Sequence, residues 1–491
     1  MTHIRKFPRL FPCAALVLAA TGLSGLVPSL CAESKSSTEP APRSESQAAE
    51  VEQAVYDQPG PALENIDQLL DDIESKLDTI EASSPQQASE LDGVILFIAD
   101  GLSYELLTGA RLYQGGSKAR LHVESLPHTA VVRVPSNSQA VTDSAAAATA
   151  ISRGYPTDNQ MVGQRPDGSS GPSLLDVARK AGWSTGLVTD DAIMGGTVAS
   201  FIVETPNRFD YARIGSKILD QLGPDKRVDL LIGGGAAVYD LKYLEEFPEQ
   251  QRGQVEQNAT ALKQLENVTV FEDWNAFQAE GQKAETALAL VRPSKLSYYG
   301  EGKRELRLAE MAVAALEWLQ QKDRPFLLVV EAALPDKAAH QNQAKLAFIE
   351  ALEFDRALKQ LMQKSSLETL VVATTDHGTG GFTVNYYLPA TIQGDALLGK
   401  EPLNHRSIIG WVTGPGGPKP AEKEANENTT LGPEDPEYRQ PAAMFMNSAS
   451  HTAGDVWAAA AGPGSEAVTG WIDNDDLFRI IGRAILVMPG R

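Results

Sequence analysis

Three long apolar segments of the chain each end in an acidic residue. Residues 93–99, 326–330 and 370–375 are followed by Asp100, Glu331 and Asp376. Continuous apolar runs are typical of parallel strands that are buried on both faces. Because the carboxyl ends of parallel strands meet at one edge of a sheet, the three acids should share one crevice. The pattern predicts an α/β fold, a three-layer sandwich with a mostly parallel central sheet and a site at the C-terminal ends of its strands.

A second apolar pattern, between residues 61 and 82, predicts an amphipathic helix. Its apolar residues recur at alternating spacings of three and four, which places them on one helix face. The stretch covers under three heptads, which favours packing against the main domain over an independent coiled coil. The residues of this stripe are Leu63, Ile66, Leu70, Ile73, Leu77 and Ile80.

The first 32 residues have the organisation of a secretory signal peptide. Basic residues at positions 5, 6 and 9 precede an apolar stretch at 13–27, and Ala32 marks the expected cleavage point. A membrane anchor is the alternative, but the apolar stretch is short for a span of about 20 residues. Residues 33–60, rich in Ser, Glu, Pro and Ala, indicate a flexible linker. We therefore expect an exported protein, periplasmic or extracellular, without a stable membrane span.

Residues 91–491 form the predicted main domain, which is long enough for one large α/β core with insertions. Residues 236–302 are expected to be an inserted, mostly helical segment. Residues 385–449, rich in Gly, Pro and Asn, are expected to form loops near the site.

Composition narrows the chemistry and the partners. Both cysteines, Cys13 and Cys31, fall in the predicted signal peptide, so the mature chain would have no thiol chemistry. The net charge of −21 argues against nucleic acid and anionic membranes as partners. Bound cations would be the largest local charges in a site, so the overall acidity does not exclude an anionic substrate.

One serine opens an alanine-rich segment, Asp143-Ser144 followed by four alanines. At a helix N-terminus, free backbone N–H groups and the helix dipole favour an alkoxide and a bound phosphate. A helix cap is the alternative role for such a serine. The segment alone leaves both roles open, and the strand-end acids favour a nucleophile.

Three of the seven histidines lie near acids in the sequence. Carboxylate and imidazole donors suit zinc, whereas carboxylates with a hydroxyl suit magnesium. His122, His128 and His405 lack such neighbours and are interpreted as ordinary residues. The three candidates are His340, four residues after Asp336; His377, directly after Asp376; and His451, which begins His-Thr-Ala-Gly-Asp.

Together these segments resemble the alkaline phosphatase family, from residue 91 to the C-terminus and in the family's order. The resemblance implies a metal-dependent phosphate monoester hydrolase that acts through a phosphoserine intermediate, with two zinc ions and one magnesium ion. The matching motifs are Val-Ile-Leu-Phe-Ile-Ala-Asp100-Gly, Thr142-Asp-Ser144-Ala-Ala-Ala-Ala, Gly-Gly-Thr197-Val-Ala, Glu331 with Asp336 and His340, Asp376-His377, and His451-Thr-Ala-Gly-Asp.

The resemblance also implies a role for each site residue. Ser144 would be the nucleophile and contact metal, Arg208 is similar to the family's substrate-clamping arginine, and Lys337 is similar to a lysine that reaches phosphate through water. A guanidinium can hold two phosphate oxygens with parallel hydrogen bonds. Surface charges are the alternative for both basic residues. The implied ion ligands are Asp336, His340 and His451 for the first zinc, Asp100, Asp376 and His377 for the second, and Asp100, Thr197 and Glu331 for magnesium.

Two positions depart from the family's pattern. Gly195 stands two residues before Thr197, where relatives usually carry Asp or His, so magnesium is expected to bind weakly. Thr379 stands two residues after His377, where many relatives carry another histidine. The support that this second residue gives to a zinc ligand is therefore in question.

Two rival functions stay open. One is a phosphodiesterase of the same superfamily, and the other is a metal-binding secreted protein without catalytic activity. Arg208, and a serine rather than a threonine at position 144, favour small phosphate monoesters as substrates. The sequence allows a homodimer and leaves the oligomeric state open.

Overall fold

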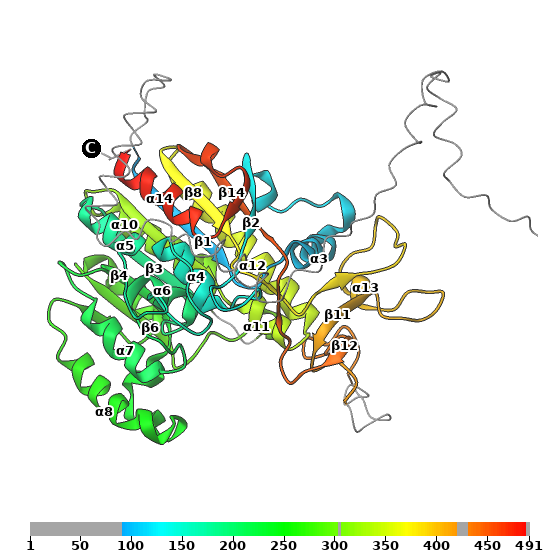
Figure 1. The fold of residues 1–491 in the computed structure, drawn as a ribbon, viewed down its shortest axis with the longest axis horizontal. Coiled ribbons are helices and arrows are strands. Elements are labelled where there is room, and N and C mark those ends of the chain that lie inside the picture. The colour runs from blue at the N-terminus through cyan, green and yellow to red at the C-terminus, as the bar shows by residue number, and fades with distance from the viewer. Residues whose placement is uncertain (1–90, 303–305, 420–430, 488–491) are drawn as a thin grey trace, which may run out of the picture. The chain divides into compact units, whose positions relative to one another are not determined.

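The structure is a computed structural model that describes residues 91–302, 306–419 and 431–487. The predicted signal peptide, linker and helix at 61–82 lie outside the described residues. A ten-stranded, mostly parallel sheet lies between two helical layers (Figure 1). The predicted three-layer α/β architecture is confirmed.

The central sheet contains one strand, β14, that runs antiparallel to both of its neighbours, while the other pairings are parallel. Strand β1 lies between β8 and β7, near the middle of the sheet (Figure 1). In sheet order the strands are β15 (Gly470–Asp473), β2 (His128–Arg133), β14 (Val456–Ala461), β8 (Thr369–Thr374), β1 (Gly93–Ala99), β7 (Phe326–Ala332), β3 (Ser184–Ala192), β4 (Leu230–Gly234), β6 (Ala287–Arg292) and β5 (Thr269–Phe271).

The register of the central strands brings the predicted acids to one edge. Ile98 of β1 pairs with Glu331 of β7 on one side and with Thr374 of β8 on the other. Asp100 and Asp376 each follow their strand within two residues. The apolar runs thus place all three acids at the C-terminal ends of adjacent strands.

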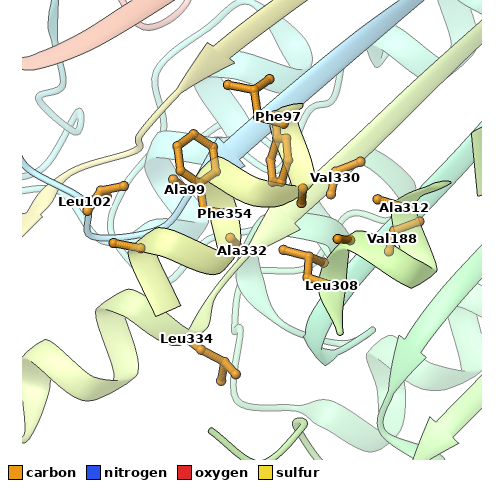
Figure 2. Close-up of a cluster of buried hydrophobic side chains, with 14 of the residues drawn as sticks. Phe97, Ala99, Leu102, Val188, Leu308, Ala312, Val330, Ala332, Leu334 and Phe354 are labelled. Carbon is orange, nitrogen blue, oxygen red and sulfur yellow. The ribbon is translucent and has the colours of Figure 1, made fainter. Parts of the chain in front are cut away.

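The central strands contribute alternate side chains to two cores, as the pleat requires. In β1, Ile95, Phe97 and Ala99 face one core, and Val94, Leu96 and Ile98 face the other. Figure 2 shows Phe97 next to Phe354, and the two rings meet edge to face with centroids 4.8 Å apart. The cores fix β1 from both sides, and with it the position of Asp100.

The two helical layers differ in composition. The layer over Phe97 contains α3 (Tyr104–Gly115), α10 (Leu308–Gln320) and α12 (Ala344–Lys364). The opposite layer contains α4 (Ser144–Arg153), α5 (Leu174–Lys180), α6 (Gly196–Ile202), α7 (Tyr211–Asp220) and α14 (Asp476–Val487).

The two segments expected to be insertions contain strands as well as helices and loops. Residues 236–302 include α8 (Glu249–Lys263) and α9 (Trp274–Glu280), and they also supply β5 and β6 of the central sheet. Residues 385–449 include the helix α13 (Asp395–Leu398) and two strands, β11 (Ile409–Gly414) and β12 (Ala442–Phe445). The two strands form a small sheet with β10 (Thr383–Val384). None of the helices in the described ranges is long and apolar enough to cross a membrane.

Candidate active site

A tight turn after β1 joins Asp100 to two other parts of the site. The backbone N–H of Gly101 donates to Asp376 Oδ1 at 3.1 Å. Gly101 has φ +70°, and a Cβ there would lie 2.7 Å from the Cβ of Asp336. Only glycine suits both this left-handed conformation and the close approach of α11 (Leu334–His340).

One cluster of potential metal ligands contains Asp100, Asp376 and His377, whose ligand atoms lie within 4.8 Å of one another. His377 Nε2 lies 3.5 Å from Asp100 Oδ1 and 3.3 Å from Asp376 Oδ2. Both oxygens are buried and accept no hydrogen bond. Because an unpaired buried carboxylate oxygen is costly, a cation at this point fits the donor set well.

A second cluster contains Asp336, His340 and His451. Each imidazole places Nδ1 against a carbonyl oxygen: His340 against Ala449 at 2.6 Å, and His451 against Thr142 at 2.9 Å. A carbonyl only accepts, so each neutral ring carries its hydrogen on Nδ1 and a lone pair on Nε2. The two Nε2 atoms lie 3.2 Å apart, and Asp336 Oδ2 lies 3.2 Å from His340 Nε2. Two converging lone pairs beside a carboxylate fit a zinc ion.

A short two-stranded ladder brings His451 into this cluster. In it, β13 (His451–Thr452) pairs with β9 (Gly378–Thr379), and His451 lies opposite Thr379. The Thr379 hydroxyl donates to Asp336 Oδ1 at 2.6 Å and lies 3.4 Å from His377 Nδ1. The threonine that departs from the family's pattern therefore supports a carboxylate of this cluster.

A third group lies where β7 and α6 approach Asp100. The Thr189 hydroxyl donates to Glu331 Oε2 at 2.5 Å. The Thr197 hydroxyl oxygen, near the start of α6, is buried and has no hydrogen-bond partner. Two carboxylates and a hydroxyl suit a magnesium ion, and the unpartnered Thr197 oxygen is consistent with that fit.

Burial and mutual repulsion raise the pKa values of several of these acids. Burial and the neighbouring Asp336 raise the pKa of Asp376 to about 7. Burial and Asp191 raise the pKa of Glu331 to about 8, and burial and Asp376 raise that of Asp100 well above its ordinary value. Divalent cations would hold these groups in the ionised form.

The histidine-rich cluster has the opposite effect on its own acid. Burial alone would raise the pKa of Asp336, but His340, His451 and His377 hold it well below its ordinary value. Burial and the other rings lower the pKa of His377 well below its usual range and lower that of His451. Low pKa values keep these two rings neutral, which is the form that binds metals.

Ser144 is the first residue of α4, and its neighbour Asp143 is the cap. Asp143 Oδ1 accepts from the Ala146 backbone N–H at 3.0 Å. The serine hydroxyl is therefore not used for capping, and it lies 3.1 Å from His377 Nε2. The alternative that Ser144 is only a helix cap is wrong.

The same aspartate holds the predicted phosphate clamp. Asp143 Oδ2 accepts from Arg208 Nη1 at 2.9 Å, and the two side chains are each only 16% exposed. Burial alone would lower the pKa of Arg208, but Asp143 raises it, so the guanidinium stays charged. Arg208 is thus fixed beside the N-terminus of α4, next to Ser144.

Lys337 and Asp191 form a further ion pair at the edge of the site. Lys337 Nζ lies 3.2 Å from Asp191 Oδ2. Asp191 was not among the residues predicted from the sequence, although Asp190 and Asp191 lie near the C-terminal end of the buried strand β3, as Asp100 follows β1. That strand-end pattern could have identified it. The structure thus brings together the eleven residues predicted for the site and adds Asp143, Thr189, Asp191 and Thr379.

Comparisons with known proteins identify the family. A family model described as alkaline phosphatase matches residues 92–487. Alkaline phosphatase 4 of Bacillus subtilis (strain 168) is 30% identical over 315 residues, 62% of this chain and 65% of the relative. The human tissue-nonspecific isozyme is 27% identical over 363 residues, 63% of this chain and 66% of the relative. The matched part therefore spans slightly less than two thirds of these curated relatives.

The fold is also similar to a solved structure. The alkaline phosphatase from the Antarctic bacterium TAB5 superposes with a TM-score of 0.62 at 22% identity, over 80% of this chain and 98% of that chain. This likeness concerns the arrangement of the strands and helices. Since the family model matches residues 92–487, most of the chain, the protein belongs to the alkaline phosphatase family.

Proposed function

We propose that this protein hydrolyses phosphate monoesters through a phosphoserine intermediate on Ser144. The observation that carries the proposal is the position of the serine hydroxyl, at a helix N-terminus and 3.1 Å from His377 Nε2. Arg208 lies against the preceding residue, Asp143, at 2.9 Å. Nucleophile, helix N-terminus and guanidinium therefore surround one small volume.

Positively charged and polar groups around Ser144 would bind the phosphoryl group of the substrate. Arg208 would hold two oxygens of the phosphoryl group, while Asp143 restricts the position of its guanidinium. The first backbone N–H groups of α4 add a favourable field for the phosphate. Lys337, paired with Asp191, would contribute further positive charge.

The chemistry consists of two displacements at phosphorus. Ser144 Oγ loses its proton and forms a bond to phosphorus as the bond to the ester oxygen breaks, and the alcohol leaves with a proton taken from water. Water then attacks the phosphoserine, the Oγ–phosphorus bond breaks, and inorganic phosphate is released while the serine regains a proton.

The residues present fit three cations. Zinc would be held by Asp336, His340 and His451 at one position and by Asp100, Asp376 and His377 at a second, with Ser144 in reach; magnesium would be held by Asp100, Thr197 and Glu331. When bound, such ions would lower the pKa of the serine hydroxyl and stabilise the departing oxygen.

Both rivals have less support. A diester presents fewer free oxygens to the Arg208 clamp, so the clamp favours monoesters. A protein without activity would not need Ser144 uncapped and facing the ligand cluster. Assays on 4-nitrophenyl phosphate and bis(4-nitrophenyl) phosphate side by side, with metal analysis of the same sample, test the proposal. Faster hydrolysis of the diester would overturn it in favour of a phosphodiesterase.

Acid quenching during turnover tests the intermediate. A phosphorylated peptide that contains Ser144 is the expected product in mass spectrometry. Phosphate-free peptide under conditions of rapid turnover would instead indicate direct attack by water.

We also propose that the protein is exported, with cleavage after Ala32. N-terminal sequencing of the mature protein tests this position, and a retained leader would contradict it.

Size-exclusion chromatography with light scattering decides between the monomer and the homodimer that the sequence leaves open.

A further inference from the structure

The backbone conformation of Gly195 is one that any residue can adopt, but other atoms occupy the space that a side chain at this position would need. Gly195 has φ −55° and ψ 147°, which most residues can adopt. A Cβ there would lie 3.0 Å from the carbonyl oxygen of Ala192 and 3.3 Å from Asp191 Oδ2. The carboxylate of Asp191 therefore lies at the point where a side chain at position 195 would begin.

The strand β3 is irregular in the segment that carries Asp191. The register between β3 and β4 shifts between Val188 and Ala192, in the segment that contains Asp191. Such bulges redirect side chains and are common beside active sites. The Asp191 side chain is 15% exposed and is paired with Lys337, so it is directed into the site and not into bulk solvent.

Asp191 is also connected to Glu331 through one hydroxyl. Its backbone N–H donates to Thr189 Oγ1 at 2.9 Å, and the Thr189 hydroxyl donates to Glu331 Oε2 at 2.5 Å. The position of Asp191 is therefore coupled to a predicted magnesium ligand. Neither bond involves the Asp191 carboxylate, which stays available to Lys337 and to water.

We infer that Asp191 supplies, from β3, the carboxylate that Gly195 lacks, and that it acts as a positioning residue for the magnesium site. This inference rests on the proposed function of Asp100, Thr197 and Glu331. Asp191 Oδ2 is paired with Lys337 Nζ at 3.2 Å, so the role that we infer for Asp191 is to hold Lys337 and the water of a hydrated ion. Magnesium retains water wherever protein ligands are missing, and a carboxylate can accept hydrogen bonds from that water.

Substitutions of Asp191 and Lys337 should change the magnesium affinity in opposite directions. Magnesium should bind more firmly than Gly195 alone suggests. Asp191→Asn removes the charge while preserving the shape, and it also leaves Lys337 less neutralised beside the acids, so magnesium affinity should fall. Lys337→Met removes the competing cation, so magnesium affinity should rise.

Calorimetric titration of magnesium into the zinc-loaded protein tests these signs without using activity. Asp191→Asn should weaken magnesium binding by at least about 10-fold, the effect typical of losing a partner beyond the metal's direct ligands. Zinc content should stay unchanged. The exposed Asp323→Asn is the matched control and should bind magnesium as the wild type does.

Two variants at position 195 keep the test decisive if Asp191→Asn folds poorly. Gly195→Asp alone should fail to tighten magnesium binding, because its Cβ would lie 3.3 Å from Asp191 Oδ2, which already occupies that space. The double variant Asp191→Asn/Gly195→Asp should recover part of the affinity lost in Asp191→Asn.

Two contrary results have different meanings. Equal magnesium affinity in Asp191→Asn and wild type would overturn the role of Asp191 and leave the magnesium site intact. A zinc-loaded wild-type protein that binds no magnesium would overturn the site itself, and the inference with it.

Discussion

The Nε2 atoms of His340 and His451 lie 3.2 Å apart, and in the neutral rings each bears a lone pair because Nδ1 faces a carbonyl oxygen. Two lone pairs at this distance repel each other unless a cation lies between them. The pair therefore gives the most direct test of metal loading.

His451→Ala should reduce the zinc content from two ions per chain to one, because the first site would keep only Asp336 and His340. Metal analysis after dialysis measures this. His405→Asn is the control, since His405 is exposed and its left-handed backbone tolerates asparagine. Two zinc ions retained in His451→Ala would show that another residue completes the site.

Ser144→Ala should lower monoester turnover by at least about 1000-fold, because the nucleophile is lost while the rest of the site is preserved. Zinc content should stay nearly unchanged. Ser125→Ala, at an exposed position outside the site, should retain full activity. Turnover by Ser144→Ala within about 10-fold of wild type would exclude the covalent pathway.

Arg208→Ala should weaken inhibition by inorganic phosphate and slow monoester hydrolysis far more than diester hydrolysis, because a diester offers fewer oxygens to the guanidinium. Parallel kinetics on the two substrate classes measure the difference. Arg165→Ala serves as the control, since Arg165 packs over Tyr155 outside the site. Equal losses on both substrates would support the diesterase alternative.

Thr379→Val should lower zinc affinity by about 10-fold, because Asp336 loses the hydroxyl that donates to it at 2.6 Å. Competition with a chelator of known affinity measures the change. Thr383→Val, on the exposed strand β10, is the matched substitution. If both variants hold zinc equally well, the Thr379 hydroxyl does not support the site.

The metal-free protein should lose stability as the pH rises from 7 to 9. The folded pKa values of Asp376, about 7, and of Glu331, about 8, exceed those of unfolded carboxyl groups, so the folded state holds protons that the unfolded state has lost. This contribution is complete below the unfolded pKa of about 4 and disappears as the pH passes through the folded values.

Thermal melts in chelator should therefore show Tm falling by on the order of 2 to 4 °C over this interval. The metal-loaded protein should change less, because its carboxylates stay ionised, and Glu331→Gln should reduce the slope of the metal-free protein. A rise in the Tm of the metal-free protein with pH would contradict the pKa directions.

The three-layer fold and the edge of the sheet that carries the site could be predicted from the sequence. An apolar run such as 93–99 buries side chains on both of its faces, which is typical of a central parallel strand. The acids and histidines proposed as ligands could be singled out because each lies next to the end of an apolar run or one helical turn from a partner. Asp191 was missed because Gly195 was compared with its counterpart in relatives, position by position. A side chain that enters the same space from a neighbouring position of the chain has no signal in such a comparison.

Loop and segment predictions were less complete for a related reason. Residues 236–302 have a helical composition, yet β5 and β6 pair with strands from elsewhere, and pairing of this kind depends on tertiary context. The role of Asp143 had a similar limit. Its place before Ser144 indicates a cap, but the ion pair with Arg208, 65 residues away, requires the folded chain.

The β9–β13 ladder also sets an order of events during translation. His451 follows His340 by 111 residues and reaches it only after β13 has paired with β9. A ribosome-bound chain that ends before β13 carries only two of the three groups of the cluster formed by Asp336, His340 and His451. Because metal binding and folding are coupled at such sites, the finished chain, and not the nascent one, would be the species that binds a zinc ion there.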